Sequence, residues 1–301
     1  MKYRAQAPAK LNLLLHVLGR EASGYHAIET LFIKLALHDV VDIDTSVSHR
    51  SLTCDGPMMP TQGLGAPEQN LAYRAAELFA ERAGWATGFA ISVEKHIPVG
   101  GGLGGGSADA AAVLRALNAI APQPLSRSAL LELAGALGSD VPFLVSDALL
   151  AWGWARGDRL LALPALPPMP VQLITFREGV NTGAAYKALG ITAASIAGAC
   201  SYDAGTFASW ESILEIATND FERAVPALHG GVAEWLPRLQ AEARRLRAAG
   251  QPSLALMSGS GATCFLVHPP DFAPEWPDRL VNAQVVHTST ASAIVSPERI
   301  A

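Results

Sequence analysis

The sequence predicts a protein of the α+β class that folds as two α/β sandwich domains. The first observation is alternation: the large apolar residues Phe89, Ile91 and Val93 alternate with Ala90, Ser92 and Glu94, which is the period of a half-buried strand. The second is the helical spacing of apolar residues, which is clear at residues 232–249. The third is a proline-dense stretch at residues 164–170, which predicts a junction near residues 155–170 between an N-terminal domain, residues 1–160, and a C-terminal domain, residues 161–301.

The N-terminal segment is predicted to be strand. Residues 3–17 are expected to form strands around a break at Pro8, and a second strand pair is expected at residues 29–36 and 39–45. Alternation in the first segment places four residues on one face: Lys10, Asn12, Leu14 and His16. A lysine at the start of a strand is more often a surface charge than a functional group, so local sequence leaves both roles open for Lys10.

A glycine-rich loop follows the strand at residues 89–93. Six of the seven residues from Gly100 to Gly106 are glycine, and Ser107 after them is a plausible N-cap for an alanine-rich helix. Glycine lets the backbone approach a ligand closely, and the free N–H groups at the start of a helix carry a partial positive charge. This order of strand, glycine loop and helix predicts a phosphate-binding cradle.

The common phosphate-binding motifs do not account for this loop. A dinucleotide fingerprint requires an acidic residue about 20 positions further on, and residues 118–125 contain none. A Walker loop requires a lysine before its last serine, whereas Gly106 precedes Ser107 here. A protein-kinase loop requires an HRD-type segment downstream, which is absent. A flexible linker is the remaining alternative, but a strand and a helix flank the glycines too tightly for one.

Further elements follow in order. Asn70 is predicted to cap a helix that Gly84 ends, and residues 126–137 form another helix. Asp140 then lies between glycine, serine and proline, where local sequence favours an ordinary turn aspartate. In the second half, a strand at residues 171–176 leads through a loop to a helix that carries Tyr186.

Composition excludes several classes of protein. Of the 301 residues 50% are hydrophobic and 16% are charged, which predicts a large buried core. A net charge of -5 and the lack of a basic run argue against nucleic-acid partners. The scattered cysteines Cys54, Cys200 and Cys264 are expected to be reduced thiols. No apolar run approaches 18 residues, so we expect a soluble cytoplasmic protein without a membrane partner.

Three separated motifs together resemble the GHMP kinase superfamily, the small-molecule kinases related to galactokinase, homoserine kinase and mevalonate kinase. They are PAKLNL at residues 8–13, PVGGGLGGGSADAA at 98–111 and MSGSGATCF at 257–265. Gly24-Tyr25-His26 and the GSDVPF stretch at 138–143 make the chain look like members whose acceptor is a cytidylated methylerythritol. The resemblance implies the superfamily fold, with the active site in a cleft between two domains.

The resemblance implies transfer of the ATP γ-phosphoryl group to the 2-hydroxyl of this small-molecule substrate, with ATP and Mg²⁺ as cofactors. It implies Asp140 as the base that receives the hydroxyl proton and Lys10 as the neighbouring cation that stabilises the developing alkoxide. The residues implied on the ATP side are Asn70, Glu94, Lys95, Pro98, Gly100, Gly101, Gly102, Leu103, Gly104, Gly105, Gly106 and Ser107. The residues implied for the substrate are Asn12, Tyr25, His26, Thr182 and Tyr186.

Several points stay open at this level. Glu94 and Lys95 lie at a strand end, where a solvent salt bridge is the competing interpretation. Ala108-Asp109 replaces a Ser-Asn pair found in many relatives, so the metal ligands are unknown and the acid could lie near the phosphates or contact Mg²⁺. Trp154-Ala155-Arg156 departs from the family pattern as well. We expect a monomer or weak homodimer. The alternatives are another kinase of the superfamily, acting on mevalonate, homoserine or a sugar, or a catalytically silent ligand-binding relative.

Overall fold

The computed structural model describes residues 1–22, 24–85, 88–191, 202–272, 276, 279–280 and 282–300. Its strands form two sheets. The larger sheet contains β1 (Lys2–Arg20), β2 (His26–Asp44), β3 (Arg50–Asp55), β4 (Phe89–Glu94), β5 (Leu150–Ala155), β6 (Arg159–Leu163), β8 (Thr218–Asn219) and β13 (Glu298–Ile300). The smaller sheet has the order β11 (Arg279–Leu280), β12 (Ala283–Ser289), β7 (Pro170–Phe176), β10 (Cys264–Val267) and β9 (Leu254–Met257).

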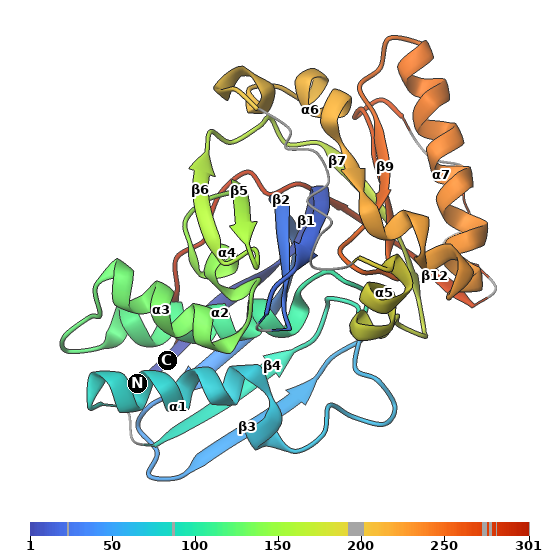
Figure 1. The fold of residues 1–301 in the computed structure, drawn as a ribbon. Helices are drawn as coiled ribbons and strands as arrows, with labels where there is room; N and C mark the ends of the chain where they lie inside the picture. The colour runs from blue at the N-terminus through green and yellow to red at the C-terminus, as the bar shows by residue number, and fades with distance from the viewer. Residues whose placement is uncertain are drawn as a thin grey trace.

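The helices gather in two groups. They are α1 (Leu71–Ala83), α2 (Gly105–Ile120), α3 (Arg127–Leu137), α4 (Val141–Val145), α5 (Thr182–Leu189), α6 (Trp210–Ile216) and α7 (Gly230–Ala248). Short 3-10 turns add η1 (Pro67–Gln69), η2 (Ala204–Phe207), η3 (Asp220–Arg223) and η4 (Val225–Ala227). In Figure 1, α1, α2 and α3 lie on the side of β3 and β4, whereas α7 lies beside β7 and β9. The long strands β1 and β2 run between the two groups (Figure 1). This is the α+β arrangement that the sequence predicted.

The strands β1 and β2 are each one continuous element of 19 residues. The expected break at Pro8 is wrong, because the pairing of β1 with β2 continues through a register shift between Pro8 and Lys10. The expected division of residues 29–36 from 39–45 is wrong for the same reason: β2 pairs along β1 on both sides of it. A bulge admits an irregular residue without ending a strand.

A second register shift, between Asn12 and Leu14, changes which side chains reach the site. Leu14 belongs to the core that the larger sheet shares with α1 and α2, whereas Leu15 lines a large cavity beside the glycine loop. The expectation that Leu14 shares a face with Lys10 is therefore wrong. Lys10 and Asn12 do share a face, as predicted.

Most helix ends lie where the sequence placed them. Asn70 caps α1 by accepting a hydrogen bond from the Ala72 N–H (2.9 Å), and Gly84 ends α1 in the left-handed conformation. The expected cap at Ser107 is wrong. Helix α2 begins at Gly105, three residues earlier than a Ser107 cap requires, with Gly104 as N-cap at a φ of +74°. Glycine enters a helix at that φ without strain, so the glycines extend the helix toward the loop.

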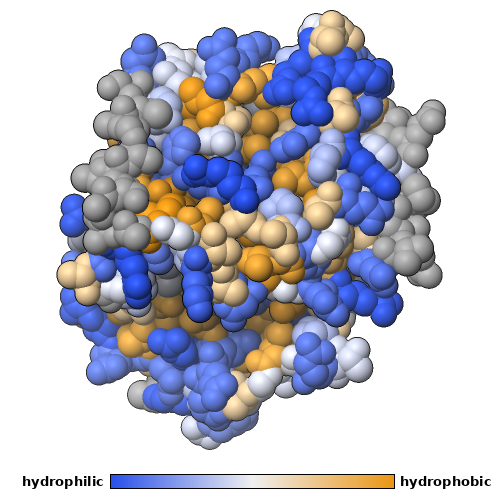
Figure 2. All heavy atoms as spheres, turned by 45° about the vertical axis from the view of Figure 1, so that its right-hand side comes forward, coloured by the Kyte–Doolittle hydropathy of each residue, from blue (hydrophilic) through white to orange (hydrophobic). Residues whose placement is uncertain are grey.

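Two apolar cores hold the molecule together. One lies between the larger sheet and the helices α1 to α4, includes Phe79, Phe89 and Leu114, and continues onto residues of the smaller sheet such as Leu173 and Phe265. The other lies between the smaller sheet and α7, and includes Trp235 and Leu266. In Figure 2 apolar residues appear in separate patches between hydrophilic ones on the face shown. Within the described part of the chain, no helix is long and apolar enough to cross a membrane.

Two of the three cysteines lie in the part of the chain that the structure describes. Cys54 and Cys264 are free thiols there, as the sequence predicted, and Cys264 is buried in the smaller sheet. Cys200 lies outside the described residues.

The division of the chain at residue 160 remains a prediction. All strands of the smaller sheet follow residue 160, which agrees with it. However, β8 and β13 also follow that residue and pair with β1 in the larger sheet. Segments from the second half of the chain therefore belong to the sheet of the first half.

Candidate active site

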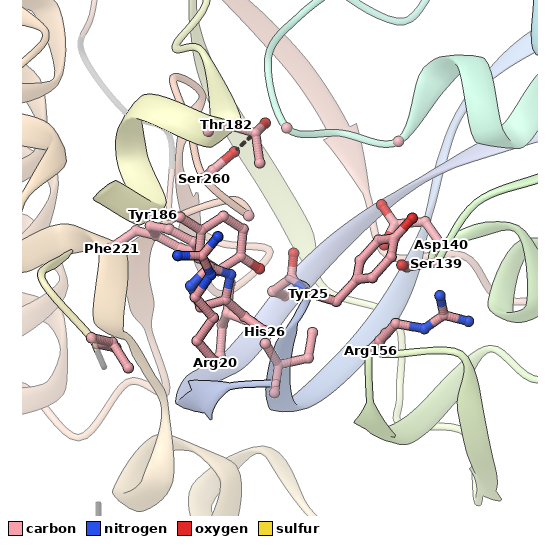
Figure 3. Close-up of a pocket in the computed structure, with 18 of the residues that line it drawn as sticks. Arg20, Tyr25, His26, Ser139, Asp140, Arg156, Thr182, Tyr186, Phe221 and Ser260 are labelled. Atoms are coloured by element: carbon pink, nitrogen blue, oxygen red, sulfur yellow. Dashed lines mark hydrogen bonds between the residues drawn. The ribbon is translucent and has the colours of Figure 1, made fainter. Parts of the chain in front are cut away.

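A cavity of about 1040 Å³ lies where the two glycine loops, the first strands and α5 meet. Its lining includes Lys10 and Asn12 from β1, Asp140 before α4, and Tyr186 from α5. In Figure 3, Arg20, His26, Tyr186 and Phe221 lie together, Tyr25, Ser139, Asp140 and Arg156 lie across from them, and Thr182 lies beside Ser260. We call the side of the cavity formed by His26, Tyr186 and Phe221 the aromatic wall, and the side that carries Lys10, Asn12 and Asp140 the floor.

The two glycine loops are in direct contact. The Ser258 hydroxyl donates to the Gly102 carbonyl (2.9 Å), and the Thr263 N–H donates to the Gly101 carbonyl (3.1 Å). A Cβ added at Gly102 would lie 2.3 Å from the Ser258 carbonyl oxygen, so only glycine permits this approach. Asn219 holds the second loop from the other side, since its amide donates to the carbonyls of Met257 (2.6 Å) and Gly259 (2.8 Å).

The first loop presents backbone N–H groups at the start of α2. The first helical hydrogen bond of α2 runs from the Ala108 N–H to the Gly104 carbonyl (2.8 Å). The N–H groups of Gly105, Gly106 and Ser107 therefore lie outside the helical ladder, where they are available to an anion. The Lys10 N–H donates to the Leu103 carbonyl (3.0 Å), which fixes the loop against β1.

Lys10 and Asp140 meet on the floor of the cavity. The Lys10 ammonium lies 3.4 Å from Asp140 Oδ2 and donates to Asn12 Oδ1 at 2.7 Å. The Asn12 amide in turn donates to the Thr30 hydroxyl (2.7 Å), and Thr30 donates to the Leu14 carbonyl (2.7 Å). Lys10 is 3% exposed, so this chain of hydrogen bonds holds a buried ammonium in one position.

The aromatic wall is built by stacking. The rings of His26 and Tyr186 are parallel within 11° with centroids 4.1 Å apart, and Phe221 contacts Tyr186 edge-on at 4.8 Å. Burial and the charge of Arg20 lower the pKa of His26, which favours the neutral imidazole near pH 7. Burial and the charge of Asp140 raise the pKa of Tyr186 to about 12, so its phenol keeps its proton. A neutral imidazole both donates and accepts hydrogen bonds, as recognition of a nucleobase edge requires.

Tyr25 lies apart from this stack and is 55% exposed. The guanidinium carbon of Arg156 lies 4.8 Å from the centre of the Tyr25 ring, and Arg156 also pairs with Asp158 at 2.9 Å. The backbone turns at Ala155 with a φ of +61°, immediately before Arg156. The departure at Trp154-Ala155-Arg156 therefore brings a cation over an exposed aromatic ring. Arg20 and Lys187 also line the cavity and add positive charge.

Lys95 lies beneath the first glycine loop. It is 2% exposed and is hydrogen-bonded to Asp39 and to Asp109 Oδ2, the latter at 2.6 Å. Asp39 also accepts from the Ile97 N–H (2.7 Å), so the three side chains join β2, α2 and the segment that follows β4. Burial raises the pKa of Asp109 to about 7. Asp109 does not line the cavity, and the departure at Ala108-Asp109 supplies an ion pair under the loop.

Comparisons with known proteins agree on one family. The model of the GHMP kinases N terminal domain matches residues 70–147. The 4-diphosphocytidyl-2-C-methyl-D-erythritol kinase of Paracoccus denitrificans is 41% identical over 87% of this chain and 85% of its own length. That of Desulfitobacterium hafniense is 33% identical over 94% of both chains. The chain belongs to the 4-diphosphocytidyl-2-C-methyl-D-erythritol kinase family.

Solved structures give the same result for the fold. A crystal structure of 4-(cytidine 5'-diphospho)-2C-methyl-D-erythritol kinase matches with a TM-score of 0.71 and 31% identity, covering 96% of this chain and 100% of that one. Homoserine kinase from Cytophaga hutchinsonii matches with a TM-score of 0.66 at 16% identity, covering 99% and 96% of the two chains, and this likeness is one of fold. The GHMP kinase fold of this 4-diphosphocytidyl-2-C-methyl-D-erythritol kinase family member is thereby confirmed.

Some of the residues expected at the site line the cavity and others do not. Those that line the cavity are Lys10, Asn12, Tyr25, His26, Gly102, Gly104, Ser107, Asp140, Thr182 and Tyr186. The Thr182 hydroxyl is hydrogen-bonded to Ser260 of the second loop (3.0 Å; Figure 3). The roles of all these residues remain predictions.

Three residues expected on the ATP side do not line this cavity: Asn70, Glu94 and Lys95. The Asn70 side chain caps α1, and the exposed carboxylate of Glu94 pairs with His96 at 3.0 Å, as the competing salt-bridge interpretation expected. Lys95 is engaged under the loop, so its ammonium would have to leave two carboxylates to bind a nucleotide directly. Their assignment to ATP stays a prediction.

Sequence reasoning missed several residues of the site. Arg20, Arg156, Lys187, Phe221 and Ser260 all line the cavity. Arg20, Arg156 and Lys187 are charged, and nothing in the sequence around them distinguishes them from ordinary solvent-exposed cations. Phe221 belongs to η3, and its contact with Tyr186 joins segments 35 residues apart in the chain.

Proposed function

We propose that this enzyme transfers the γ-phosphoryl group of ATP to the 2-hydroxyl of 4-diphosphocytidyl-2-C-methyl-D-erythritol, in the non-mevalonate pathway to isoprenoid precursors. The observation that carries the proposal is the pairing of Lys10 with Asp140 at the junction of two glycine loops. This pair lies in the same cavity as the stacked His26 and Tyr186. The cavity therefore offers a place for a phosphoryl donor and a place for a nucleobase-bearing acceptor.

In the proposed reaction Asp140 accepts the proton of the acceptor hydroxyl. The acceptor oxygen then bonds to the γ-phosphorus while the bond from that phosphorus to the ADP oxygen breaks. The Lys10 ammonium, 3.4 Å from Asp140, stabilises the charge on the attacking oxygen. The free N–H groups at the start of α2 hold the phosphates, because they point out of the helix and carry partial positive charge.

The acceptor is proposed to lie along the aromatic wall. Cytosine presents a donor and two acceptors, which a neutral His26 can match, and its ring can stack on an aromatic neighbour. Arg20, Arg156 and Lys187 supply the positive charge that a diphosphate requires. The 2-hydroxyl would then lie toward Asn12 and Asp140.

Mg²⁺ is proposed to enter with the ATP phosphates. Among the described residues there is no group of three or more His, Cys, Asp or Glu that could hold a metal ion by itself. The Ser107 hydroxyl offers an oxygen ligand at the cavity next to the loop, which suits a magnesium ion that is bound mainly by phosphates. When bound, the ion neutralises charge that develops on the transferred phosphoryl group.

A panel of acceptors tests the proposal. Purified enzyme is given Mg-ATP with the cytidylated methylerythritol, methylerythritol 4-phosphate, mevalonate, homoserine or galactose, and ADP release is followed. We expect turnover only with the cytidylated compound, because the other acceptors lack the base that the aromatic wall recognises. Turnover of one of the others with the cytidylated compound inert would refute the proposal, and inertness toward all would favour a silent relative.

A further inference from the structure

A second buried lysine lies beside the catalytic pair. Lys34 on β2 is 0% exposed and is the direct cross-strand partner of Lys10 on β1. Residues that face each other across two paired strands project from the same side of the sheet. The two lysines therefore approach the same layer of the molecule, and that layer contains α4 and the residue before it.

Lys34 is bound to one end of α4. Its ammonium donates to the Ser146 carbonyl at 2.6 Å and to the Leu144 carbonyl at 3.2 Å. Helix α4 ends at Val145 with Ser146 as its C-cap, so these are carbonyls that the helix leaves without an internal partner. A cation at a helix C-terminus also interacts favourably with the helix dipole.

No carboxylate among the described residues is within ion-pair distance of Lys34. Burial lowers the pKa of Lys34 to about 7, and the charge of Arg115 on α2 acts in the same direction. Asp147 acts against them, but its side chain is 84% exposed and lies 4.0 Å from Arg115. A buried ammonium without a carboxylate partner costs folding free energy unless its hydrogen bonds stabilise the fold or the active site.

The other end of α4 carries Asp140. Asp140 is the N-cap residue, and the Leu144 N–H donates to the Asp140 carbonyl at 3.2 Å. One helical turn thus connects Leu144, whose carbonyl accepts a hydrogen bond from Lys34, to Asp140, which Lys10 contacts. The spacing between the two ends is fixed by the helix itself.

Two stacked phenylalanines join α4 to the sheet. Phe32 on β2 and Phe143 in α4 stack with centroids 5.0 Å apart and planes within 15°. The Lys34 ammonium lies 5.2 Å from the Phe143 ring centre, and the Lys10 ammonium lies 5.8 Å from that of Phe32. Both lysines and both rings form one layer, which leaves α4 little freedom to move.

We propose that Lys34 is a positioning residue, which sets the place of the Asp140 carboxylate by holding the opposite end of α4. The inference rests on the proposed function, because it gives Asp140 the role of base. Lys34 itself does not line the cavity and touches no reacting atom. Its effect must therefore pass through Asp140.

A double-mutant cycle tests this path. Lys34→Met removes the charge and the hydrogen bonds while keeping an unbranched chain. We expect it to lower kcat at least about 10-fold when Asp140 is present, the scale on which a small misplacement of a catalytic group acts. We expect KM for ATP and for the acceptor to change less than about twofold. In an Asp140→Asn background, Lys34→Met should change kcat less than about twofold, since the base it positions is absent.

Controls separate positioning from stability. Ile43→Ala removes a fully buried side chain on the same strand, far along it from α4, so it lowers stability without affecting kcat in either background. Lys34→Arg keeps the charge and the donors and should recover most of the lost kcat. Lys34→Gln keeps a donor without the charge and replaces the Met variant in the cycle if that variant does not fold.

A second readout needs no acceptor. In enzyme labelled with carbon-13 at aspartate carboxyls, the Asp140 resonance, assigned by its loss in Asp140→Asn, should shift in Lys34→Met and stay in place in Ile43→Ala. An unmoved Asp140 resonance overturns the inference, as does an equal loss of kcat in both backgrounds of the cycle. An acceptor panel that fails altogether refutes the proposed function alone, because the resonance still decides the role of Lys34.

Discussion

The contact between the two glycine loops predicts a large difference between two similar substitutions. Gly100 and Gly102 both have a left-handed backbone, with φ of +78° and +76°. An alanine at either position costs about 1–2 kcal/mol for this conformation. The two positions differ in the room available to a side chain. An added Cβ at Gly100 meets only the Gly179 Cα at 4.0 Å, whereas at Gly102 it meets the Ser258 carbonyl oxygen at 2.3 Å.

The added cost at Gly102 follows from the bonds that must open. The neighbouring atoms are backbone, so relief requires the loops to separate by about 1.2–1.7 Å, judged against ordinary carbon contacts near 3.5–4 Å. That separation breaks the hydrogen bonds from Ser258 to Gly102 and from Thr263 to Gly101. Each lost bond costs about 1–2 kcal/mol when its groups stay buried. We expect Gly102→Ala to lose about 3–6 kcal/mol and Gly100→Ala about 1–2 kcal/mol.

Urea denaturation of the two variants and the wild type, followed by tryptophan fluorescence, measures this difference without any ligand. Gly102→Ala should also lose at least about 10-fold in kcat, because the Lys10 N–H is bound to the same loop at Leu103. Equal losses of stability in the two variants, within about 0.5 kcal/mol, would refute the reasoning. In that case the loops would not be held by the close approach at Gly102.

Three further predictions concern single side chains. Asp140→Asn should keep nucleotide affinity in a binding titration but lose at least about 100-fold in ADP release, and near-normal turnover would remove Asp140 from its role. His26→Ala should raise KM for the cytidylated acceptor about 3- to 10-fold through lost stacking, with KM for ATP unchanged; an unaltered acceptor KM would contradict the base-binding wall. Burial raises the pKa of Glu222 from 4.5 to about 7, so its contribution to stability is complete below pH 4.5 and is lost as pH rises to 7. Glu222→Gln should remove this loss, up to about 3 kcal/mol between about pH 4 and 9 by thermal unfolding, and identical pH dependence would falsify the shift.

The sequence alone determined the local elements of this protein and the identity of its loops. Alternation and capping residues set β4, α1 and α3 close to their observed ends, because period and end signals act between residues a few positions apart. The glycine run predicted a phosphate cradle from backbone freedom alone. Lys10 and Asp140 were found through motif resemblance, since nothing local to either of them distinguishes it from a surface charge or a turn residue.

Tertiary structure decided which side chains meet. The register shift between Asn12 and Leu14 in β1 leaves Asn12 on the site face and moves Leu14 to the core, and no local pattern marks such a shift. Asp109 looked like a phosphate or metal ligand in sequence but pairs with Lys95 beneath the loop. Lys34 bonds to carbonyls 110 and 112 residues away, and Asn219 holds a loop 38 and 40 residues further on. Such contacts depend on how distant segments pack against one another, and the residues next to each partner in the chain do not indicate that packing.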